Sequence, residues 1–173
     1  MKNIILVGYM GSGKSSVARL LGDRLNAFVL DTDEKIERDA DMKISRIFEE
    51  FGEERFRDME TELLRSMKDE NAGFLISTGG GMPMRPENRK LLKELGTVIY
   101  LKASPEVIAR RLEHDTTRPL LVGAKLLSEK EERIGAMLKL RNGAYTECAD
   151  IVIDTDDLSV EEIVSVIFQK IRG

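Results

Sequence analysis

The chain has 173 residues, a length typical of one compact domain, and 42% of them are hydrophobic, which is enough for a sizeable core. Charged residues make up 34% of the sequence and the net charge is −4. These values exclude a disordered chain and argue against a general nucleic-acid or membrane-surface binder.

The compartment can be predicted from a few simple features. A single cysteine, Cys148, excludes an intramolecular disulfide and fits a reducing environment. The sequence begins with a strand-like run rather than a signal peptide, and no apolar stretch approaches the roughly 18 residues of a membrane span. We therefore expect a soluble, cytoplasmic monomer.

The N-terminal part alternates predicted strands with predicted helices. Residues 3–8, NIILVG, form a short apolar run typical of a buried parallel strand, and residues 15–25 show helical spacing of apolar side chains. A second strand is predicted at 27–31. Residues 34 to about 69 are helical and highly charged, with breaks near 39–42 and at Gly52.

The middle of the chain continues the alternation. Residues 73–78 predict a third strand, followed by three glycines at 79–81. A helix over 86–95 leads to a fourth strand at 97–101. Ser104-Pro105 then has the pattern of an N-cap followed by proline at the first helical position, and it opens a helix that ends near residue 112.

The C-terminal part begins with an irregular stretch. Residues 113–125 have no clean periodicity and are predicted to form a loop or lid. The sequences SEKE at 128–131 and SVEE at 159–162 match the capping box, so each is expected to open a helix. Between these two helices, residues 150–154 predict a fifth strand. Strands and helices in this alternation predict one α/β domain with a parallel sheet covered on both faces.

A phosphate-binding loop follows the first predicted strand. Gly8, Gly13, Lys14 and Ser15 satisfy the pattern G-x-x-x-x-G-K-[ST]. Such a loop wraps a phosphate with its own N–H groups, and the following helix directs its N-terminus at the same anion. Lysine at this position reaches the β- and γ-phosphates, and the serine hydroxyl suits Mg²⁺. The sequence therefore predicts a nucleoside triphosphate site.

Two aspartates follow the second predicted strand, and they are candidates for the other side of this site. Asp31 and Asp33 are two apart, so in an extended chain both would face the cleft at the carboxyl ends of the strands. An alternative for Asp33 is the N-cap of the helix that begins at Glu34, and the two roles are compatible.

The acceptor side is indicated by residues that are individually weak signals. Arg57 and Glu60 are three apart on a helix, which also fits a simple surface ion pair. The glycines at 79–81 could expose backbone N–H groups to a small polar ligand. Arg118 lies in the predicted lid, and Arg141 lies late in a helix, where it could bind a carboxylate. A GTPase is excluded because no N-K-x-D segment follows a later strand.

Taken together, these segments resemble the shikimate kinase family over essentially the whole chain. Six motifs carry the resemblance: G-Y-M-G-S-G-K-S at 8–15, D-T-D at 31–33, F-R-D-M-E at 56–60, G-G-G at 79–81, R-P-L-L at 118–121 and R-N-G-A-Y at 141–145. The family often has a proline where this chain has Gly143, which predicts a softer end for the helix that carries Arg141.

The resemblance implies a three-layer P-loop kinase fold similar to the nucleoside monophosphate kinases, with a five-stranded parallel sheet in the order 2-3-1-4-5. It implies one kinase domain over 1–173, with an acceptor-binding segment at about 33–61 and the lid at about 113–125. The implied activity is transfer of the γ-phosphate of ATP, with Mg²⁺, to the 3-hydroxyl of shikimate, a step toward chorismate and the aromatic amino acids.

Residue roles follow from the same resemblance. The implied catalytic residues are Lys14, Asp33 and Arg118. The implied ATP-binding residues are Gly11, Ser12, Gly13, Lys14, Ser15, Ser16, Arg118 and, on the adenine, Arg111 or alternatively Arg110. The implied shikimate-binding residues are Asp33, Arg57, Gly79, Gly80, Gly81 and Arg141, with Glu60 orienting Arg57. The implied Mg²⁺ ligands are Ser15 and, through water, Asp31.

Two alternatives remain open at this point. One is a P-loop kinase of another small acid such as gluconate, or of a nucleotide. The other is a nucleotide-binding switch that signals through lid closure, which would be expected to lack Asp33 or the lid arginine. Neither nucleic acid nor a membrane is expected as a partner.

Overall fold

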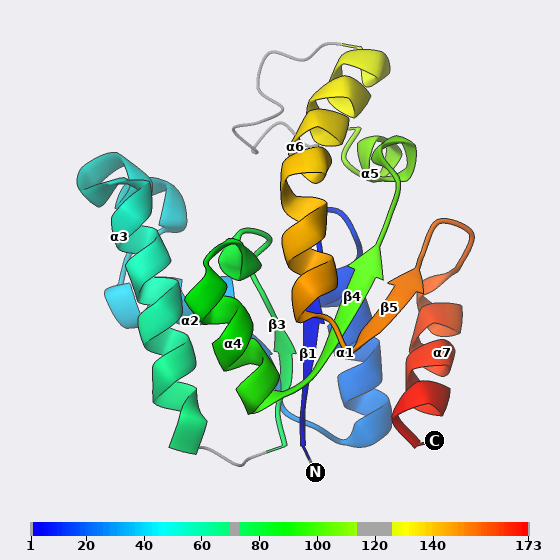
Figure 1. Ribbon diagram of the computed structural model, residues 1–173, viewed down its shortest axis with the longest axis horizontal. Helices are drawn as coiled ribbons and strands as arrows, with labels where there is room; N and C mark the ends of the chain where they lie inside the picture. The colour runs from blue at the N-terminus through cyan, green and yellow to red at the C-terminus, as the bar shows by residue number, and fades with distance from the viewer. Residues whose placement is uncertain (1, 70–72, 114–125, 173) are drawn as a thin grey trace.

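The computed structural model describes residues 2–69, 73–113 and 126–172. Five parallel strands form one sheet in the order β2-β3-β1-β4-β5 (Figure 1), which confirms the predicted fold and strand order. The strands are β1 (Asn3–Val7), β2 (Val29–Asp31), β3 (Leu75–Ser77), β4 (Gly96–Lys102) and β5 (Ile151–Asp154).

Helices connect the strands and cover both faces of the sheet. The α-helices are α1 (Lys14–Leu25), α2 (Thr32–Ala40), α3 (Ile44–Ser66), α4 (Pro86–Leu95), α5 (Pro105–Arg111), α6 (Leu127–Cys148) and α7 (Val160–Arg172). Two short 3-10 helices, η1 (Met67–Asp69) and η2 (Met82–Met84), end α3 and follow the glycines at 79–81. Among the described residues, no helix is long and apolar enough to cross a membrane.

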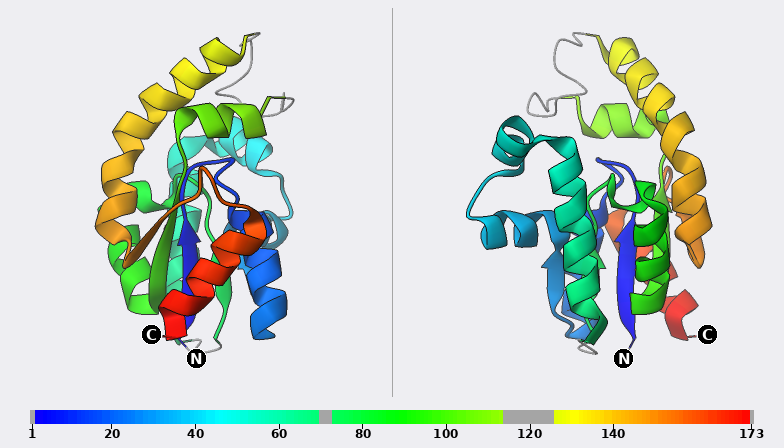
Figure 2. Two further views of the ribbon diagram at one scale, coloured as in Figure 1. Left: turned by 90° about the vertical axis from the view of Figure 1, so that its right-hand side faces the viewer. Right: turned by 60° about the vertical axis from the view of Figure 1, so that its left-hand side comes forward.

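The sheet separates two hydrophobic cores. Successive side chains of a strand point to opposite faces. Ile4 and Leu6 of β1 therefore pack with α1 and α7, whereas Ile5 and Val7 pack with α3, α4 and α6. The left panel of Figure 2 shows these two groups of helices on opposite sides of the sheet. Both faces of β1 are buried, which explains its continuous apolar sequence.

Side-chain caps fix several helix ends. Ser104 accepts a hydrogen bond from the N–H of Val107, as the sequence predicts. Ser159 and Glu162 form the predicted capping box, in which each side chain accepts from the N–H of the other residue. The capping prediction for Ser128 is wrong, because α6 already begins at Leu127, and Ser128 lies inside the helix.

The two predicted breaks in the long charged segment are both present. The gap between α2 and α3 falls at residues 41–43. Gly52 interrupts α3 with φ 82° and ψ 168°, a conformation that an L-residue rarely adopts. The segment that contains Arg57 and Glu60 therefore starts a new helical direction after Gly52.

Gly143 lies in α6, which continues past it to Cys148. We expect Gly143→Ala to raise the free energy of unfolding by about 0.5–1 kcal/mol, because an exposed helical glycine loses more backbone entropy than alanine on folding. A Cβ there would meet no described atom within 4 Å. Urea denaturation measures the change. Gly96→Ala is the contrasting variant and should lower the midpoint, because its Cβ would collide with the carbonyl oxygen of Asn3.

Candidate active site

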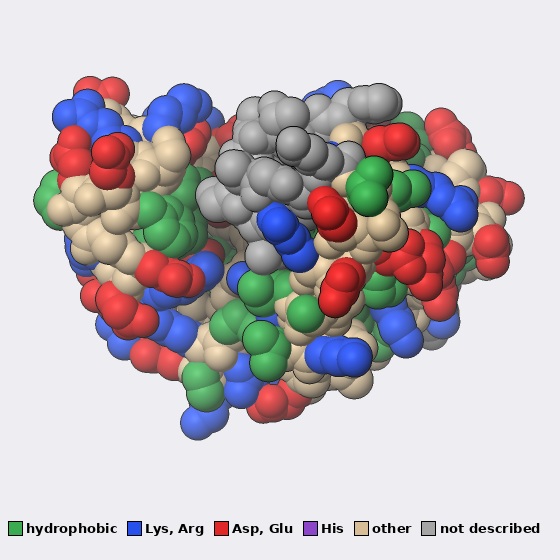
Figure 3. Space-filling view, turned by 90° about the horizontal axis from the view of Figure 1, so that it is seen from above, with side chains coloured by type: hydrophobic (Ala, Val, Ile, Leu, Met, Phe, Trp, Pro, Cys, Tyr) green, Lys and Arg blue, Asp and Glu red, His purple; other side chains and the backbone are tan. Residues whose placement is uncertain are grey.

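A cleft lies at the carboxyl ends of the central strands. Ser77 of β3 pairs with Leu6 of β1 and with Asp31 of β2, so the three strands end side by side. Figure 3 looks down on this end of the molecule, which is hollowed between the lobe of α2 and α3 and the rest of the fold. The cleft has about 270 Å³ of free volume and is lined by Met10, Gly11, Gly13, Lys14, Ser15, Ser16, Asp31, Asp33, Ser77, Thr78, Gly79, Gly80 and Leu112.

The loop between β1 and α1 has the shape of a phosphate cradle. Gly8 and Gly13 have φ values of 150° and 94°, and a Cβ at Gly8 would lie 2.7 Å from the carbonyl oxygen of Leu101. Lys14 Nζ donates to the carbonyl oxygens of Gly8 at 2.8 Å and Tyr9 at 3.0 Å. The ammonium group is therefore held inside the loop, next to the N-terminus of α1, where an anionic phosphate is favoured.

Arg111 supports the cradle from outside. Its guanidinium donates to the carbonyl oxygen of Gly11 at 3.1 Å and to that of Thr155 at 3.3 Å. It thus joins the phosphate loop to the turn that follows β5. This places Arg111 beside the loop, at the end of α5.

Asp31 and Asp33 both line the cleft, but not for the reason that the sequence suggested. β2 ends at Asp31, and Asp33 lies in the first turn of α2 rather than in extended chain. The helix cap is Asp31, whose Oδ1 accepts from the N–H groups of Asp33 at 3.0 Å and Glu34 at 3.2 Å. The alternative of Asp33 as the N-cap is therefore wrong, and its side chain is free to face the cleft.

The Asp33 carboxyl group is unusually basic for an aspartate. Burial raises its pKa to about 6, and the nearby Asp31 carboxylate adds to the rise. Lys14 and Arg57 act in the opposite direction. Asp33 Oδ1 is buried and lacks a hydrogen-bond partner among the described residues. A carboxylate in this state can accept a hydrogen bond, and at neutral pH a proton, from a ligand hydroxyl.

Arg57 and Glu60 form a largely buried ion pair beside Asp33. Arg57 Nη1 lies 2.8 Å from Glu60 Oε2, and Arg57 Nη2 lies 3.2 Å from Glu53 Oε1. Glu60 is fully buried, and this burial raises its pKa to about 7, although the Arg57 charge opposes the shift. The pair fixes the orientation of the guanidinium, and the Arg57 side chain is 13% exposed.

The three glycines at 79–81 differ in how much space a side chain would have. A Cβ at Gly79 would lie 2.5 Å from Asp33 Oδ1, and one at Gly81 would collide with the guanidinium of Arg57. The side chains of Asp33 and Arg57 therefore occupy that space. The N–H of Gly79 is already bonded to Thr32 Oγ1 at 2.9 Å, so it is not offered to a ligand as the sequence suggested. Gly80 has more room, since a Cβ there would lie 3.5 Å from its nearest neighbours.

Arg141 reaches the same loop from α6. Its Nη1 atom lies 3.7 Å from the position that a Cβ on Gly80 would take, and its guanidinium carbon lies 5.7 Å from the centre of the Tyr9 ring. Tyr145, one turn further along α6, donates from its hydroxyl to the carbonyl oxygen of Gly80 at 2.6 Å. Arg57 and Arg141 therefore flank the glycine loop at Gly81 and Gly80 respectively.

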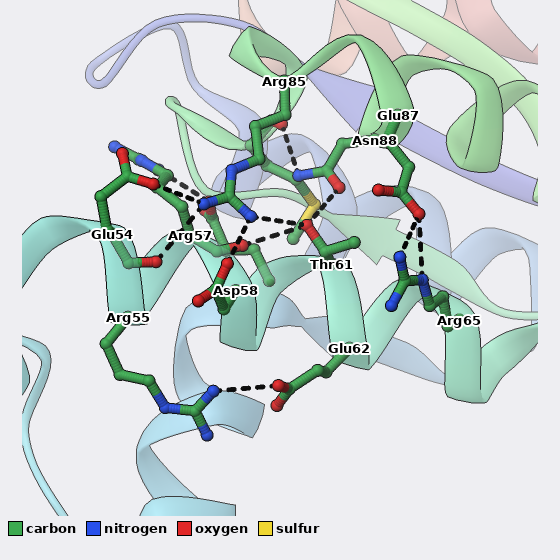
Figure 4. A network of polar contacts seen from close by, with 12 residues as sticks. Glu54, Arg55, Arg57, Asp58, Thr61, Glu62, Arg65, Arg85, Glu87 and Asn88 are labelled. Carbon is green, nitrogen blue, oxygen red and sulfur yellow. Dashed lines mark hydrogen bonds and ion pairs between the residues drawn. The ribbon is translucent and has the colours of Figure 1, made fainter.

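A polar network anchors the helix that carries Arg57 (Figure 4). Arg85 bonds to Asp58 at 2.7 Å and to Glu54 at 2.9 Å, both on α3. The buried Asn88 of α4 donates to the carbonyl oxygen of Met82 at 3.0 Å, and its Oδ1 lies 2.7 Å from Thr61 Oγ1. The segment after the glycine loop is thereby tied to α3, which fixes the two walls of the acceptor region relative to each other.

The structure thus brings together residues from distant parts of the sequence. Those gathered at the cleft and the adjoining loops are Gly11, Gly13, Lys14, Ser15, Ser16, Asp31, Asp33, Arg57, Glu60, Gly79, Gly80, Gly81, Arg111 and Arg141. Ser12 is buried within the phosphate loop, where its N–H donates to the carbonyl oxygen of Tyr9, and it does not line the cleft. Arg118 and nearly all of the predicted lid at 113–125 lie outside the described residues. Thr32 and Tyr145 contact the glycine loop but were not predicted individually. Both could have been found from the sequence, because Thr32 lies in the D-T-D motif at 31–33 and Tyr145 in the R-N-G-A-Y motif at 141–145.

The buried carboxyl groups predict a pH dependence of stability. Because the folded protein binds the Glu60 proton more tightly than the unfolded chain does, the free energy of unfolding should fall as pH rises from about 4.3, the ordinary glutamate pKa, to about 7. Urea midpoints at pH 5 and pH 8 measure this loss. Glu60→Gln should reduce it, and Glu62→Gln, on an exposed side chain of the same helix, should leave it unchanged. Equal losses in wild type and Glu60→Gln would contradict the assignment.

Comparison of the amino-acid sequence with known proteins matches nearly the whole chain to one family. The family model described as "Shikimate kinase" matches residues 10–172. The shikimate kinase of Bacillus mycoides (strain KBAB4) is 45% identical over 173 residues and covers 99% of both chains. The shikimate kinase of Thermodesulfovibrio yellowstonii is 44% identical, with 98% of this chain and 95% of that one covered.

Solved structures of proteins from the same family have the same fold as this chain. A shikimate kinase from Acinetobacter baumannii, solved in complex with shikimate, superposes with a TM-score of 0.89 at 36% identity and covers 99% of this chain and 93% of that one. The shikimate kinase from Bacteroides thetaiotaomicron also gives a TM-score of 0.89, at 29% identity, with 99% of both chains covered.

Proposed function

The chain belongs to the shikimate kinase family, and from this premise we propose that it transfers the γ-phosphoryl group of ATP to the 3-hydroxyl of shikimate. One observation of the structure supports this most directly. Lys14 and Asp33 line one cleft together with Gly79 and Gly80, and the guanidinium groups of Arg57 and Arg141 lie beside the adjoining Gly81 and Gly80. A donor triphosphate and a small hydroxylated acid therefore have adjoining sites.

The donor side is assigned to the loop of residues 11–16. Its backbone N–H groups and the N-terminus of α1 would bind the phosphates, and Lys14 would exchange its bonds to the loop carbonyls for bonds to phosphate oxygens. Arg111 would support the loop beside the adenine. Arg118 is assigned to the transferring phosphate from its sequence motif alone, since it lies outside the described residues.

The oxygen donors at the cleft fit Mg²⁺, which prefers hard oxygen ligands and retains several waters. Ser15 lines the cleft and would offer its hydroxyl, and Asp31 would act through a water on Oδ2, because Oδ1 caps α2. When bound with ATP, Mg²⁺ neutralises charge on the β- and γ-phosphates. We propose the Mg²⁺ complex of ATP as the donor.

On the acceptor side, Arg57 and Arg141 would bind the shikimate carboxylate from either side of the glycine loop. Asp33 would accept a hydrogen bond from the 3-hydroxyl and orient it toward the γ-phosphorus. As the new P–O bond forms, the bond to the ADP oxygen breaks and the hydroxyl proton passes to Asp33. Because the transition state of phosphoryl transfer is loose, orientation of the hydroxyl contributes at least as much as proton removal.

The test is an ADP-release assay with a panel of acceptors. Shikimate should stimulate ADP release from Mg-ATP and yield shikimate 3-phosphate, and gluconate and nucleoside monophosphates should not. Absence of shikimate-dependent ADP release would refute the proposal. ADP release with gluconate or a nucleoside monophosphate would favour another kinase, and ATP binding with no acceptor at all would favour a nucleotide switch.

We also propose that the enzyme is a cytoplasmic monomer built as a single domain, with its acceptor segment at about 33–61.

A further inference from the structure

The three tyrosines of the chain lie together beneath the acceptor side of the cleft. They come from three elements: Tyr9 from the phosphate loop, Tyr100 from β4 and Tyr145 from α6. Each is at most 1% exposed. The rings of Tyr100 and Tyr145 stack with centres 5.0 Å apart, and the Tyr9 ring lies under the guanidinium of Arg141. The Arg141 guanidinium therefore packs over this cluster, at the ring of Tyr9.

The hydroxyl group of Tyr145 connects two parts of the acceptor site. It donates to the carbonyl oxygen of Gly80 at 2.6 Å, and the charged Arg141 side chain lies near enough to oppose the rise in the pKa of the phenol. Arg141 and Tyr145 are four residues apart on α6 and so share one helix face. Burial strongly raises the pKa of the Tyr145 phenol, which therefore stays protonated and remains a donor to Gly80.

Tyr100 provides a contrast within the same cluster. Its hydroxyl donates at 2.7 Å to Oδ1 of Asn142, an exposed side chain of α6 that does not line the cleft. Both phenols are thus buried and hydrogen-bonded, but only the bond of Tyr145 reaches a residue assigned to shikimate binding.

We propose that Tyr145 is a positioning residue for the acceptor, and this inference rests on the proposed function. Its hydroxyl ties Gly80 to α6 one turn from Arg141, whose Nη1 atom lies 3.7 Å from the position that a Cβ on Gly80 would take, so that the guanidinium and the backbone of the glycine loop meet the shikimate carboxylate in one fixed arrangement. An arginine side chain loses rotamer entropy when it is fixed in one conformation. Fixing it before the ligand arrives removes part of that loss from the binding free energy.

Tyr145→Phe tests this role, with Tyr100→Phe as the matched control. Each variant removes one buried phenol hydroxyl and keeps the stacked ring. We expect Tyr145→Phe to raise the KM for shikimate about tenfold, the size expected for the loss of a buried hydrogen bond, and to leave the KM for ATP within about twofold. Tyr100→Phe should leave both KM values within about twofold. Thermal melting of both variants identifies a purely structural effect.

Coupling to Arg141 sharpens the test. In an Arg141→Lys background, Tyr145→Phe should add little to the loss of shikimate affinity, because the guanidinium beside Gly80 is then already absent. An unchanged KM for shikimate in Tyr145→Phe, equal changes in both tyrosine variants, or fully additive effects with Arg141→Lys would each overturn the inference. These outcomes are distinct from failure of the proposed function, which would abolish shikimate-dependent ADP release in the wild type.

A measurement on the folded wild-type protein does not depend on whether the Tyr145 variant folds. Because the chain has three tyrosines, incorporation of 3-fluorotyrosine gives three ¹⁹F resonances, which Tyr9→Phe and Tyr100→Phe assign by elimination. Addition of shikimate should shift the Tyr145 resonance more than the Tyr100 resonance. Equal shifts, or a shift confined to Tyr100, would contradict the proposal.

Discussion

Asp33→Asn should lower kcat by about a hundredfold or more while the protein stays folded, because the amide can neither accept the proton of the 3-hydroxyl nor orient it as a carboxylate does. An ordinary aspartate is a weak base at neutral pH, since its pKa is near 4. Burial raises the pKa of Asp33 to about 6, which makes it a better base and still leaves it mostly ionised at pH 7. Steady-state kinetics at saturating ATP and shikimate measures the change.

The pH profile separates this role from a structural one. In the wild type, kcat/KM should fall below about pH 6 as Asp33 becomes protonated, and this acid limb should be missing from Asp33→Asn. Asp39→Asn is the matched control on the same helix, because Asp39 is exposed and forms an ion pair with Lys35. It should retain wild-type kcat. Near-normal kcat in Asp33→Asn would exclude both the base role and the orienting role.

The second large effect concerns the buried ion pair. Arg57→Met should raise the KM for shikimate about a hundredfold, because it removes one of the two cations proposed for the carboxylate. It should also lower the free energy of unfolding by about 2 kcal/mol at pH 8, because the buried Glu60 then lacks its cationic partner. Kinetics and urea denaturation measure the two losses separately.

A double variant distinguishes the two consequences. Adding Glu60→Gln to Arg57→Met removes the unpaired charge, so stability should recover, whereas the KM for shikimate should stay high. Arg55→Met is the control, since Arg55 pairs with Glu62 on the exposed surface of the same helix and should change neither quantity much. Recovery of both stability and KM in the double variant would show that Arg57 serves the fold alone.

Much of the fold could be predicted from local sequence, because its signals are local. The apolar strands, the Ser159 capping box and the break at Gly52 depend on residues within a few positions of each other. The start of α6 was misplaced by two residues, because the N-cap is Leu126 rather than Ser128, and the N–H of Leu126 donates to the Glu129 carboxylate although leucine has no capping side chain. The strand order came from the family resemblance, because crossover connections leave no local pattern.

The site was only partly predictable for a related reason. Motifs indicated which residues gather at the cleft, but they could not indicate what each one bonds to. That Asp31 rather than Asp33 caps α2 depends on where β2 ends. That Gly79 and Gly81 leave room for Asp33 and Arg57 depends on contacts between residues more than 20 positions apart. Long-range packing of this kind is absent from the pattern of a single sequence.

The two hydrophobic cores on either side of the sheet have a consequence for how this enzyme type can diversify. The donor loop continues into α1, which packs in one core, whereas Arg57 and Arg141 are carried by α3 and α6, which pack in the other. The sheet therefore separates α1 from the helices that carry the two arginines, whereas Tyr9 of the phosphate loop packs in the same core as those helices. Repacking of the core between α1 and α7 would leave the supports of Arg57 and Arg141 in place, but repacking of the other core would also reach the phosphate loop through Tyr9.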